Sequence, residues 1–229
     1  MFRPPFFDRR DAGQALARSL TRYAFRPDVI VLALPRGGVP VGYEVAQALR
    51  APVDALLVRK LGVPGHEELA MGAIASGGVR VLNQPLIEQI GINNDTIEQV
   101  TAREREVLQA RELTYRGNRP PPTVRDRCAI LIDDGLATGA TMLAAVDAVQ
   151  QQHPRCVVVA APVAPPDMHD RLANRADDVV FVMTPHDFAG VGQWYENFEP
   201  TSDQQVRELL ARAAPAVGQA DPKASPTRR

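Results

Sequence analysis

The feature that most constrains this chain is the segment from Cys128 to Thr141, in which an apolar run passes directly into a helical pattern. The continuous apolar run 128–132 is typical of a parallel strand that is covered on both faces. The residues that follow, DDGLATGAT, are first acidic and then small, and an apolar helical pattern begins at Thr141. A strand, a short turn and a helix in this order predict an open α/β sheet that binds its ligand at the carboxyl ends of the strands.

The turn after this strand has the chemistry to bind an anion beside a sugar. Backbone N–H groups and hydroxyls at 137–141 can surround a phosphate at the start of the helix, where Thr138 is the predicted cap. The helix dipole adds roughly 0.3–1 kcal/mol for a nearby anion. Asp133 and Asp134 would repel a phosphate, so we expect them to hold vicinal sugar hydroxyls or a hydrated metal ion. Adjacent strand residues point to opposite faces, so the chain should leave strand geometry at Asp133.

The sequence DDGLATGAT resembles the phosphoribosyl-pyrophosphate (PRPP) motif of type I phosphoribosyltransferases. The Rossmann and P-loop glycine patterns are absent from this turn, while a plain strand–turn–helix capped by threonine is the alternative interpretation. The resemblance implies that Asp133 and Asp134 hold the ribose hydroxyls, through Mg²⁺ and water. It also implies that the 5′-phosphate lies on Ala137, Thr138, Gly139, Ala140 and Thr141.

A second strand–turn–helix, with the turn sequence LPRGGVPV at 34–41, repeats this logic. The residues Arg36, Gly37 and Gly38 follow a buried strand at 29–34, and a helix is expected at 39–49. Arg36 supplies a fixed positive charge, and the glycine pair permits close approach of the backbone to an anion. The resemblance implies that these three residues bind the departing pyrophosphate, and the glycine pair is compatible with a non-proline cis peptide. The alternative is a plain turn with a surface arginine.

A third strand is predicted at Val53–Leu61 and ends in a basic pair, Arg59 and Lys60. By alternation, one of these side chains should reach the ligand and the other should not. The resemblance favours Lys60 as a pyrophosphate contact, against the alternative of a basic pair that merely ends a strand. The predicted catalytic set is Asp133, Asp134, Lys60 and Arg36.

The middle of the chain is expected to form a flap followed by helices. Leu61–Met71 reads as a Gly- and Pro-rich loop, which the resemblance implies is a mobile flap, and 72–83 reads as a hairpin. Helices are predicted within 84–116, with Asn93 or Asn94 as a cap. Their charged face suggests solvent exposure, and the resemblance implies a homodimer in which arginines contact the partner's phosphate. The candidates are Arg103, Arg105, Arg116 and Arg119.

Later strands are predicted at Cys156–Val163 and Asp178–Met183, followed by the aromatic, aperiodic segment 184–200. The resemblance implies that this segment and the N-terminal segment form a small hood over the acceptor. Phe188, Trp194 and Tyr195 could stack on a planar acceptor, or they could simply fill the core of the hood.

Composition limits the remaining possibilities. The chain has 229 residues and a net charge of −1, which gives no general attraction to nucleic acid or membranes. No apolar run approaches the ~20 residues of a membrane span, and no signal peptide is visible, so we expect a cytoplasmic protein. Cys128 and Cys156 both fall in core strands and are predicted to be buried free thiols.

Together these patterns predict a doubly wound α/β fold with a mainly parallel, five-stranded sheet, a flap hairpin and a small hood. The expected domain covers residues 1–213, and 214–229 should be a disordered tail. The resemblance implies a Mg²⁺-dependent phosphoribosyltransferase that uses PRPP and an unidentified nitrogenous acceptor. The alternative is a PRPP- or nucleotide-sensing protein without turnover. No partner nucleic acid or membrane is expected.

Overall fold

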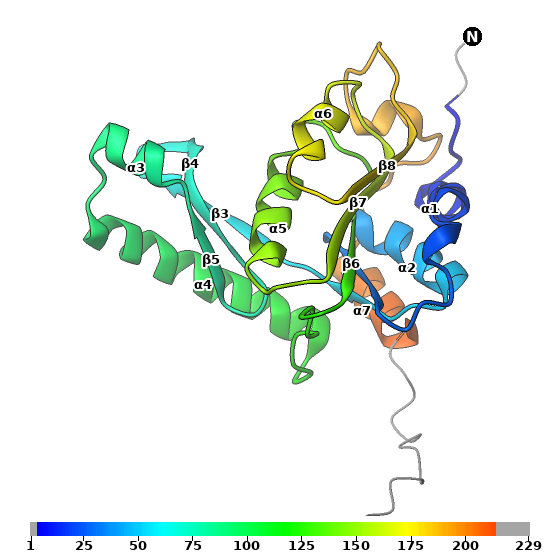
Figure 1. The fold of residues 1–229 in the computed structure, drawn as a ribbon, viewed down its shortest axis with the longest axis horizontal. Coiled ribbons are helices and arrows are strands. Elements are labelled where there is room, and N and C mark those ends of the chain that lie inside the picture. Colours follow the sequence, from blue (N-terminus) through cyan, green and yellow to red (C-terminus); the bar gives the residue numbers. More distant parts are fainter. Residues whose placement is uncertain (1–3, 214–229) are drawn as a thin grey trace, which may run out of the picture.

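The computed structural model describes residues 4–213, so the predicted tail at 214–229 lies outside the described residues. The main sheet has five parallel strands in the order β2-β1-β6-β7-β8 (Figure 1). These strands are β1 (Val29–Ala33), β2 (Val53–Ala55), β6 (Cys128–Ile132), β7 (Cys156–Val163) and β8 (Asp178–Met183). The predicted five-stranded α/β architecture is therefore confirmed.

Helices cover both faces of this sheet, as a doubly wound fold requires (Figure 1). The helices α1 (Arg9–Ser19) and α2 (Gly38–Leu49) lie on one face, and α5 (Ala140–Gln150) and α6 (Met168–Ala173) lie on the other. Alternation along β1 supplies both cores: Val31 packs on the α2 side, and Leu32 packs on the α5 side. The last helix, α7 (Asp203–Ala213), packs against α2 and the long helix α4 (Asn94–Arg116).

A smaller lobe, residues 58–116, projects from the main body and is called the flap lobe below (Figure 1). It contains an antiparallel sheet of β3 (Val58–Val63), β4 (His66–Ala75) and β5 (Val79–Leu82), followed by α3 (Gln84–Ile90) and α4. The predicted helix signals are confirmed. Gly91 ends α3 with a left-handed φ of 68°, and the Asn93 side chain caps α4 by accepting from the N–H of Thr96 at 2.8 Å.

The prediction of one strand over Val53–Leu61 is wrong, because the chain changes sheets at Leu56 and Leu57. The N–H of Leu56 still bonds to the carbonyl of Ala33 in the main sheet at 2.9 Å. The N–H of Leu57 bonds instead to the hydroxyl of Ser76 in the flap lobe at 3.1 Å. No glycine or proline marks this point, so the local residues carry no signal for the break.

The expected loop at Leu61–Met71 is also wrong, since most of it forms the β3–β4 hairpin. The hairpin turns at Pro64-Gly65, and the pairing register shifts on both sides of Gly62. A Cβ at Gly62 would lie only 2.8 Å from the backbone carbonyl oxygen of Glu67, so this glycine allows the two strands to approach closely.

The prediction that Cys128 and Cys156 are free thiols is wrong, because the two residues form a disulfide. They are direct partners in the register of β6 and β7, and their Cα atoms lie 4.5 Å apart. Sequence placed both in core strands but could not show that these strands are neighbours in this register.

The segment after β8 folds back onto the N-terminal segment. The N–H of Phe6 bonds to the carbonyl of Trp194 at 3.2 Å, and the N–H of Glu196 bonds to the carbonyl of Phe6 at 2.9 Å. Two short 3₁₀ helices, Thr21–Tyr23 and Val191–Trp194, complete the fold. None of the helices within residues 4–213 has the length and apolar character needed to cross a bilayer.

Candidate active site

The loops after β1 and β6 meet at the carboxyl edge of the main sheet. A Cβ at Gly37 would lie 2.0 Å from Oδ2 of Asp134, and a Cβ at Gly38 would lie 2.7 Å from the carbonyl oxygen of Ile132. A side chain at either position would force atoms of the other loop to move, so the contact between the loops favours glycine, whereas the sequence had suggested a ligand as the reason. The peptide bond between Pro35 and Arg36 is cis, as the glycine-rich loop allowed.

Asp133 is the first residue beyond β6, so the chain does leave strand geometry there, as predicted. Its Oδ1 accepts a hydrogen bond from the N–H of Asp134 at 2.9 Å. Burial raises the pKa of the Asp133 carboxyl well above its usual range, and the negative charge of Asp134 raises it further. A cation placed at this carboxyl would favour its ionised form and so lower the pKa of Asp133.

Asp134 is held by an arginine that sequence reasoning missed. Nε of Arg9 donates to Oδ2 of Asp134 at 2.7 Å, and the two side chains are only 11% and 14% exposed. The same guanidinium donates to the carbonyl of Glu199 at 2.7 Å and lies 4.0 Å from the centre of the Phe198 ring. Arg9 and Asp134 are separated by 125 residues, so no local pattern could have paired them. The contact neutralises one acid of the pair and ties α1 to the aromatic segment.

The three predicted acceptor residues lie in the hydrophobic cluster of the hood. Trp194 and Tyr195 are buried, and the Phe188 ring stacks on Trp194 with centroids 6.5 Å apart. The hydroxyl of Tyr195 donates to the carbonyl of Asp134, and burial raises the Tyr195 pKa. Trp194 also lines a cavity of about 460 Å³ beside Pro185. A role in acceptor binding stays a prediction for all three residues.

The predicted phosphate loop surrounds the start of α5. Gly139, rather than Thr138, occupies the N-cap position with a left-handed φ of 68°. A side chain there would also meet Met168, since a Cβ would lie 2.5 Å from its sulfur. Ala137, Thr138 and Thr141 are exposed. Arg171 of α6 donates to the carbonyl of Thr138 at 2.8 Å and adds a positive charge that no sequence pattern predicted here.

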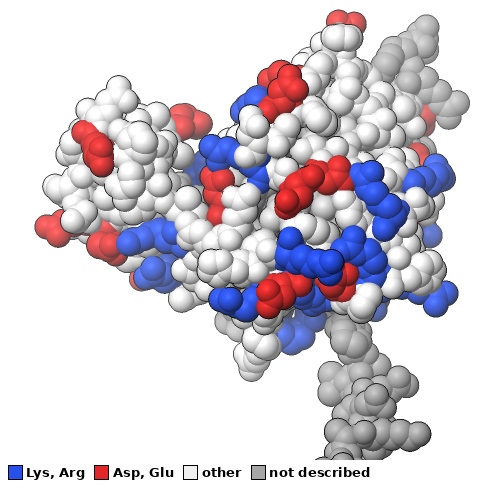
Figure 2. Space-filling model, viewed as in Figure 1, with Lys and Arg blue, Asp and Glu red and all other residues white. Residues whose placement is uncertain are grey.

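The basic residues predicted to bind pyrophosphate do not all lie together. Arg36 is half exposed, and its Nη1 lies 3.9 Å from Oδ1 of Asp203. Lys60 lies in a hollow of about 490 Å³ between α5 and the flap lobe. Figure 2 shows charged side chains of both signs between the lobe and the main body. Those lining the hollow are Lys60, Glu68, Asp147 and Arg175.

Arg59 lies on the opposite side of β3 from Lys60, as strand alternation predicted for the pair. Together with Arg111 it lines a narrow cavity of about 30 Å³ that also contacts Pro35 and Thr141. Arg59, and not Lys60, is therefore the member of the basic pair beside both predicted anion-binding loops. Contact between Lys60 and pyrophosphate stays a prediction.

The acidic pair is suited to a metal ion that a substrate also binds. Across residues 4–213, the structure groups no three His, Cys, Asp or Glu side chains in an arrangement that could hold a metal by themselves. Mg²⁺ is often held by one or two carboxylates together with water and substrate phosphates, and Asp133 and Asp134 match that pattern.

Comparison with known proteins agrees with this geometry. The family model described as phosphoribosyl transferase domain matches residues 9–197, and the chain belongs to this family. Two proteins from Mycobacterium tuberculosis strains, whose names include the words phosphoribosyl transferase, are 45% identical over 208 residues. The match covers 91% of this chain but only 47% of theirs, so the chain spans about half the length of these curated relatives. The crystal structure of TT1426 from Thermus thermophilus is 43% identical, has a TM-score of 0.83, and matches over 92% of this chain and 99% of that one.

Proposed function

We propose that this chain transfers the 5-phosphoribosyl group of PRPP to a nitrogenous acceptor and releases pyrophosphate. The observation that carries the proposal is the contact between the two loops, where Gly37 and Gly38 pack against the acidic segment after β6. A single ligand at this edge would touch both loops, as a molecule with a phosphate at one end and a diphosphate at the other requires.

Each end of PRPP has a matching group of residues in this proposal. The 5′-phosphate would bind the loop 137–141, where the start of α5 and nearby Arg171 both favour an anion. The ribose hydroxyls would bind Asp133 and Asp134. The pyrophosphate would bind Arg36, Gly37 and Gly38.

The chemistry then needs positioning and charge stabilisation more than a nucleophile. Glycosyl transfer passes through a transition state with oxocarbenium character, and the leaving pyrophosphate gains negative charge. Arginine and backbone N–H groups beside the leaving group stabilise that charge. Mg²⁺, when bound with PRPP, would neutralise part of the pyrophosphate charge, and the Asp133 and Asp134 carboxylates are the residues that would hold it. The hood would hold the acceptor, with Phe188, Trp194 and Tyr195 as the predicted contacts.

One observation favours a second candidate, a PRPP- or nucleotide-sensing protein without turnover. The carboxylate of Asp134 is already paired with Arg9, so binding of a diol to both acids would have to compete with this ion pair. A cytoplasmic location and a homodimer stay predictions.

The test combines turnover with binding. Pyrophosphate release would be measured with PRPP, Mg²⁺ and a panel of nucleobases and amines, and PRPP affinity would be measured by calorimetry. We expect the double variant Asp133→Asn, Asp134→Asn to lose PRPP binding, while Asp170→Asn, which changes a carboxylate that is 95% exposed, keeps it. PRPP binding without pyrophosphate release for any acceptor would favour the sensor. Unchanged affinity in the double variant would contradict both candidates.

A further inference from the structure

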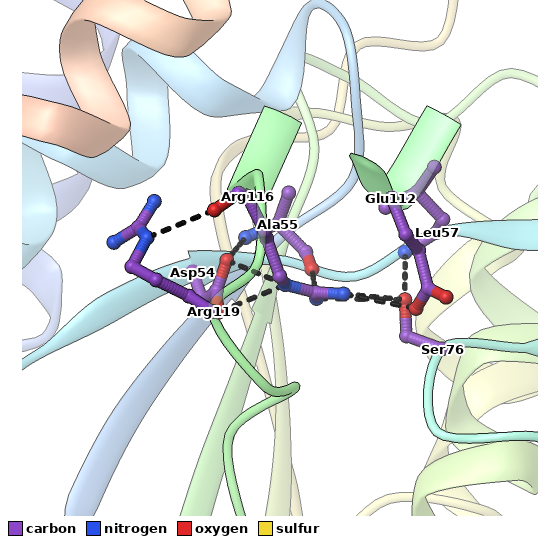
Figure 3. A network of polar contacts seen from close by, with 7 residues as sticks. All are labelled: Asp54, Ala55, Leu57, Ser76, Glu112, Arg116 and Arg119. Atoms are coloured by element: carbon purple, nitrogen blue, oxygen red, sulfur yellow. Dashed lines mark hydrogen bonds and ion pairs between the residues drawn. The ribbon is translucent and has the colours of Figure 1, made fainter. Parts of the chain in front are cut away.

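A buried arginine at the end of α4 joins the main sheet to the flap lobe (Figure 3). The Arg116 side chain is only 2% exposed. Its Nε donates to both carboxylate oxygens of Asp54 at 3.1 and 3.0 Å, and its Nη2 donates to the carbonyl of Ala55. Its Nη1 donates to Glu112 one helical turn earlier at 2.9 Å. The sequence had suggested that Arg116 contacts a phosphate in a neighbouring subunit. That prediction is not supported, because all three guanidinium nitrogens have partners within this chain.

Ser76, in the turn between β4 and β5, connects this arginine to the flap lobe. Both terminal nitrogens of Arg116 lie within 3.4–3.5 Å of the Ser76 hydroxyl oxygen. That hydroxyl also accepts from the N–H of Leu57, and the N–H of Ser76 bonds to the carbonyl of Leu57 at 2.9 Å. Figure 3 shows the guanidinium between Asp54 and Ala55 of β2 on one side and Ser76, in the turn between β4 and β5, on the other. The network therefore acts where the chain passes from the main sheet to the flap lobe.

The other side of this connection faces the candidate active site. Leu56 and Leu57 line the narrow cavity that contains Arg59 and Arg111 opposite Thr141. Glu104 of α4 orients Arg59 with hydrogen bonds of 2.9 and 2.6 Å. In the part of the chain that the structure describes, no hydrogen-bond or ion-pair partner is recorded for Arg111. Arg111 thus offers a guanidinium to an anion at the sheet edge.

The narrowness of the cavity makes its shape sensitive to the placement of the lobe. At about 30 Å³ the cavity is far smaller than the hollow of about 490 Å³ beside Lys60, so its walls lie close together. A small displacement of the flap lobe would close this space or carry both guanidinium groups out of reach. Apolar side chains could fill the position of Arg116 at a lower desolvation cost, but they would not fix the lobe through directional bonds.

We propose that Arg111 binds the pyrophosphate end of the substrate together with Arg59, and that Arg116 is a positioning residue that holds the flap lobe so that both can do so. Arg116 does not touch the substrate. This inference rests on the proposed function and adds to it a binding residue from α4 and the network that places it.

The experiment measures binding of the two ends of PRPP separately. Inorganic pyrophosphate with Mg²⁺ and ribose 5-phosphate are titrated separately into the wild-type protein and its variants by calorimetry. Arg111→Met and Arg116→Met should each lose about tenfold or more in pyrophosphate affinity, because a charge-assisted hydrogen bond is lost or misplaced. Ribose 5-phosphate affinity should change less than about twofold, since its phosphate binds the loop 137–141 on the main body. Arg116→Lys should recover part of the loss.

Arg80→Met is the matched control, because Arg80 joins β5 to α4 inside the lobe. It donates to Glu98 at 2.7 Å and to Thr101 at 3.4 Å. This variant should keep both affinities, whereas a general loosening of the lobe interior would lower its pyrophosphate affinity as well and contradict the role of Arg116.

If Arg116→Met does not fold, Ser76→Ala interrupts the same network more gently and should still weaken pyrophosphate binding selectively. Equal losses for the two ligands, or no loss in a folded variant, would overturn the positioning role. Unchanged pyrophosphate affinity in Arg111→Met would overturn the binding role. If the wild-type protein bound neither ligand, the proposed function would fail, whereas normal wild-type binding with unaffected variants would refute this inference alone.

Discussion

Gly37→Ala is predicted to destabilise the protein, although its backbone conformation would suggest the opposite. The residue has φ −61° and ψ −34°, which alanine adopts easily. At such a position a Gly→Ala change usually stabilises by about 0.4–1 kcal/mol through the unfolded state. The added Cβ would, however, lie 2.0 Å from Oδ2 of Asp134 and 2.5 Å from its Cγ, so that carboxylate must move.

The cost follows from what holds the carboxylate in place. Moving it breaks the 2.7 Å bond from Arg9 between two side chains that are largely buried. Hydrogen bonds to charged groups contribute about 1.5–3 kcal/mol, so the net loss after the entropic gain is about 1–2 kcal/mol. For a domain of this size that corresponds to a decrease in Tm of roughly 2–8 °C.

Urea unfolding and thermal unfolding both measure this effect. Gly190→Ala is the control, because its backbone is extended and a Cβ there meets no heavy atom within 4 Å, so its stability should stay within about 0.5 kcal/mol of wild type. In an Arg9→Met background, Gly37→Ala should cost less, since the bond is already absent. A Gly37→Ala protein as stable as wild type, or more stable, would refute the reasoning.

Two further predictions concern the edge and the centre of the sheet. The pKa of the Asp133 carboxyl is raised above its usual 3.8 in the folded protein. Between 3.8 and that raised pKa, the folded protein therefore binds more protons than the unfolded chain, and it loses stability as pH rises through this range. In metal-free protein, Asp133→Asn should remove this loss, and urea unfolding at pH 4 and pH 7 would then give more similar free energies than in wild type; an unchanged pH dependence would contradict it. The disulfide closes a separation of 28 residues, so replacing Cys128 and Cys156 by alanine should cost about 3.6 kcal/mol on the chain-entropy model. Protein unfolded in guanidinium without reductant should show no titratable thiol, and finding two would disprove the bond.

Much of the fold followed from local sequence alone. The strands Cys156–Val163 and Asp178–Met183 were predicted with the bounds that the structure shows, because continuous apolar runs are typical of a parallel sheet covered on both faces. Gly91 and Asn93 likewise marked the helix ends through their own backbone and side-chain preferences. The strand at Val53–Leu61 was predicted wrongly because both halves favour strand, and only the backbone bonds of Leu56 to Ala33 and of Leu57 to Ser76 reveal where the chain changes sheets.

The sequence by itself determined that a turn and a helix start follow two adjacent acids at a sheet edge, because strand, turn and helix signals act over a few neighbouring residues. Only the tertiary structure decided that Asp134 pairs with Arg9, that a side chain at Gly37 would displace that carboxylate, and that Cys128 meets Cys156. It also placed Arg59 rather than Lys60 beside Thr141. These contacts join residues far apart in the chain, and they depend on strand order, register and packing, which no local pattern encodes.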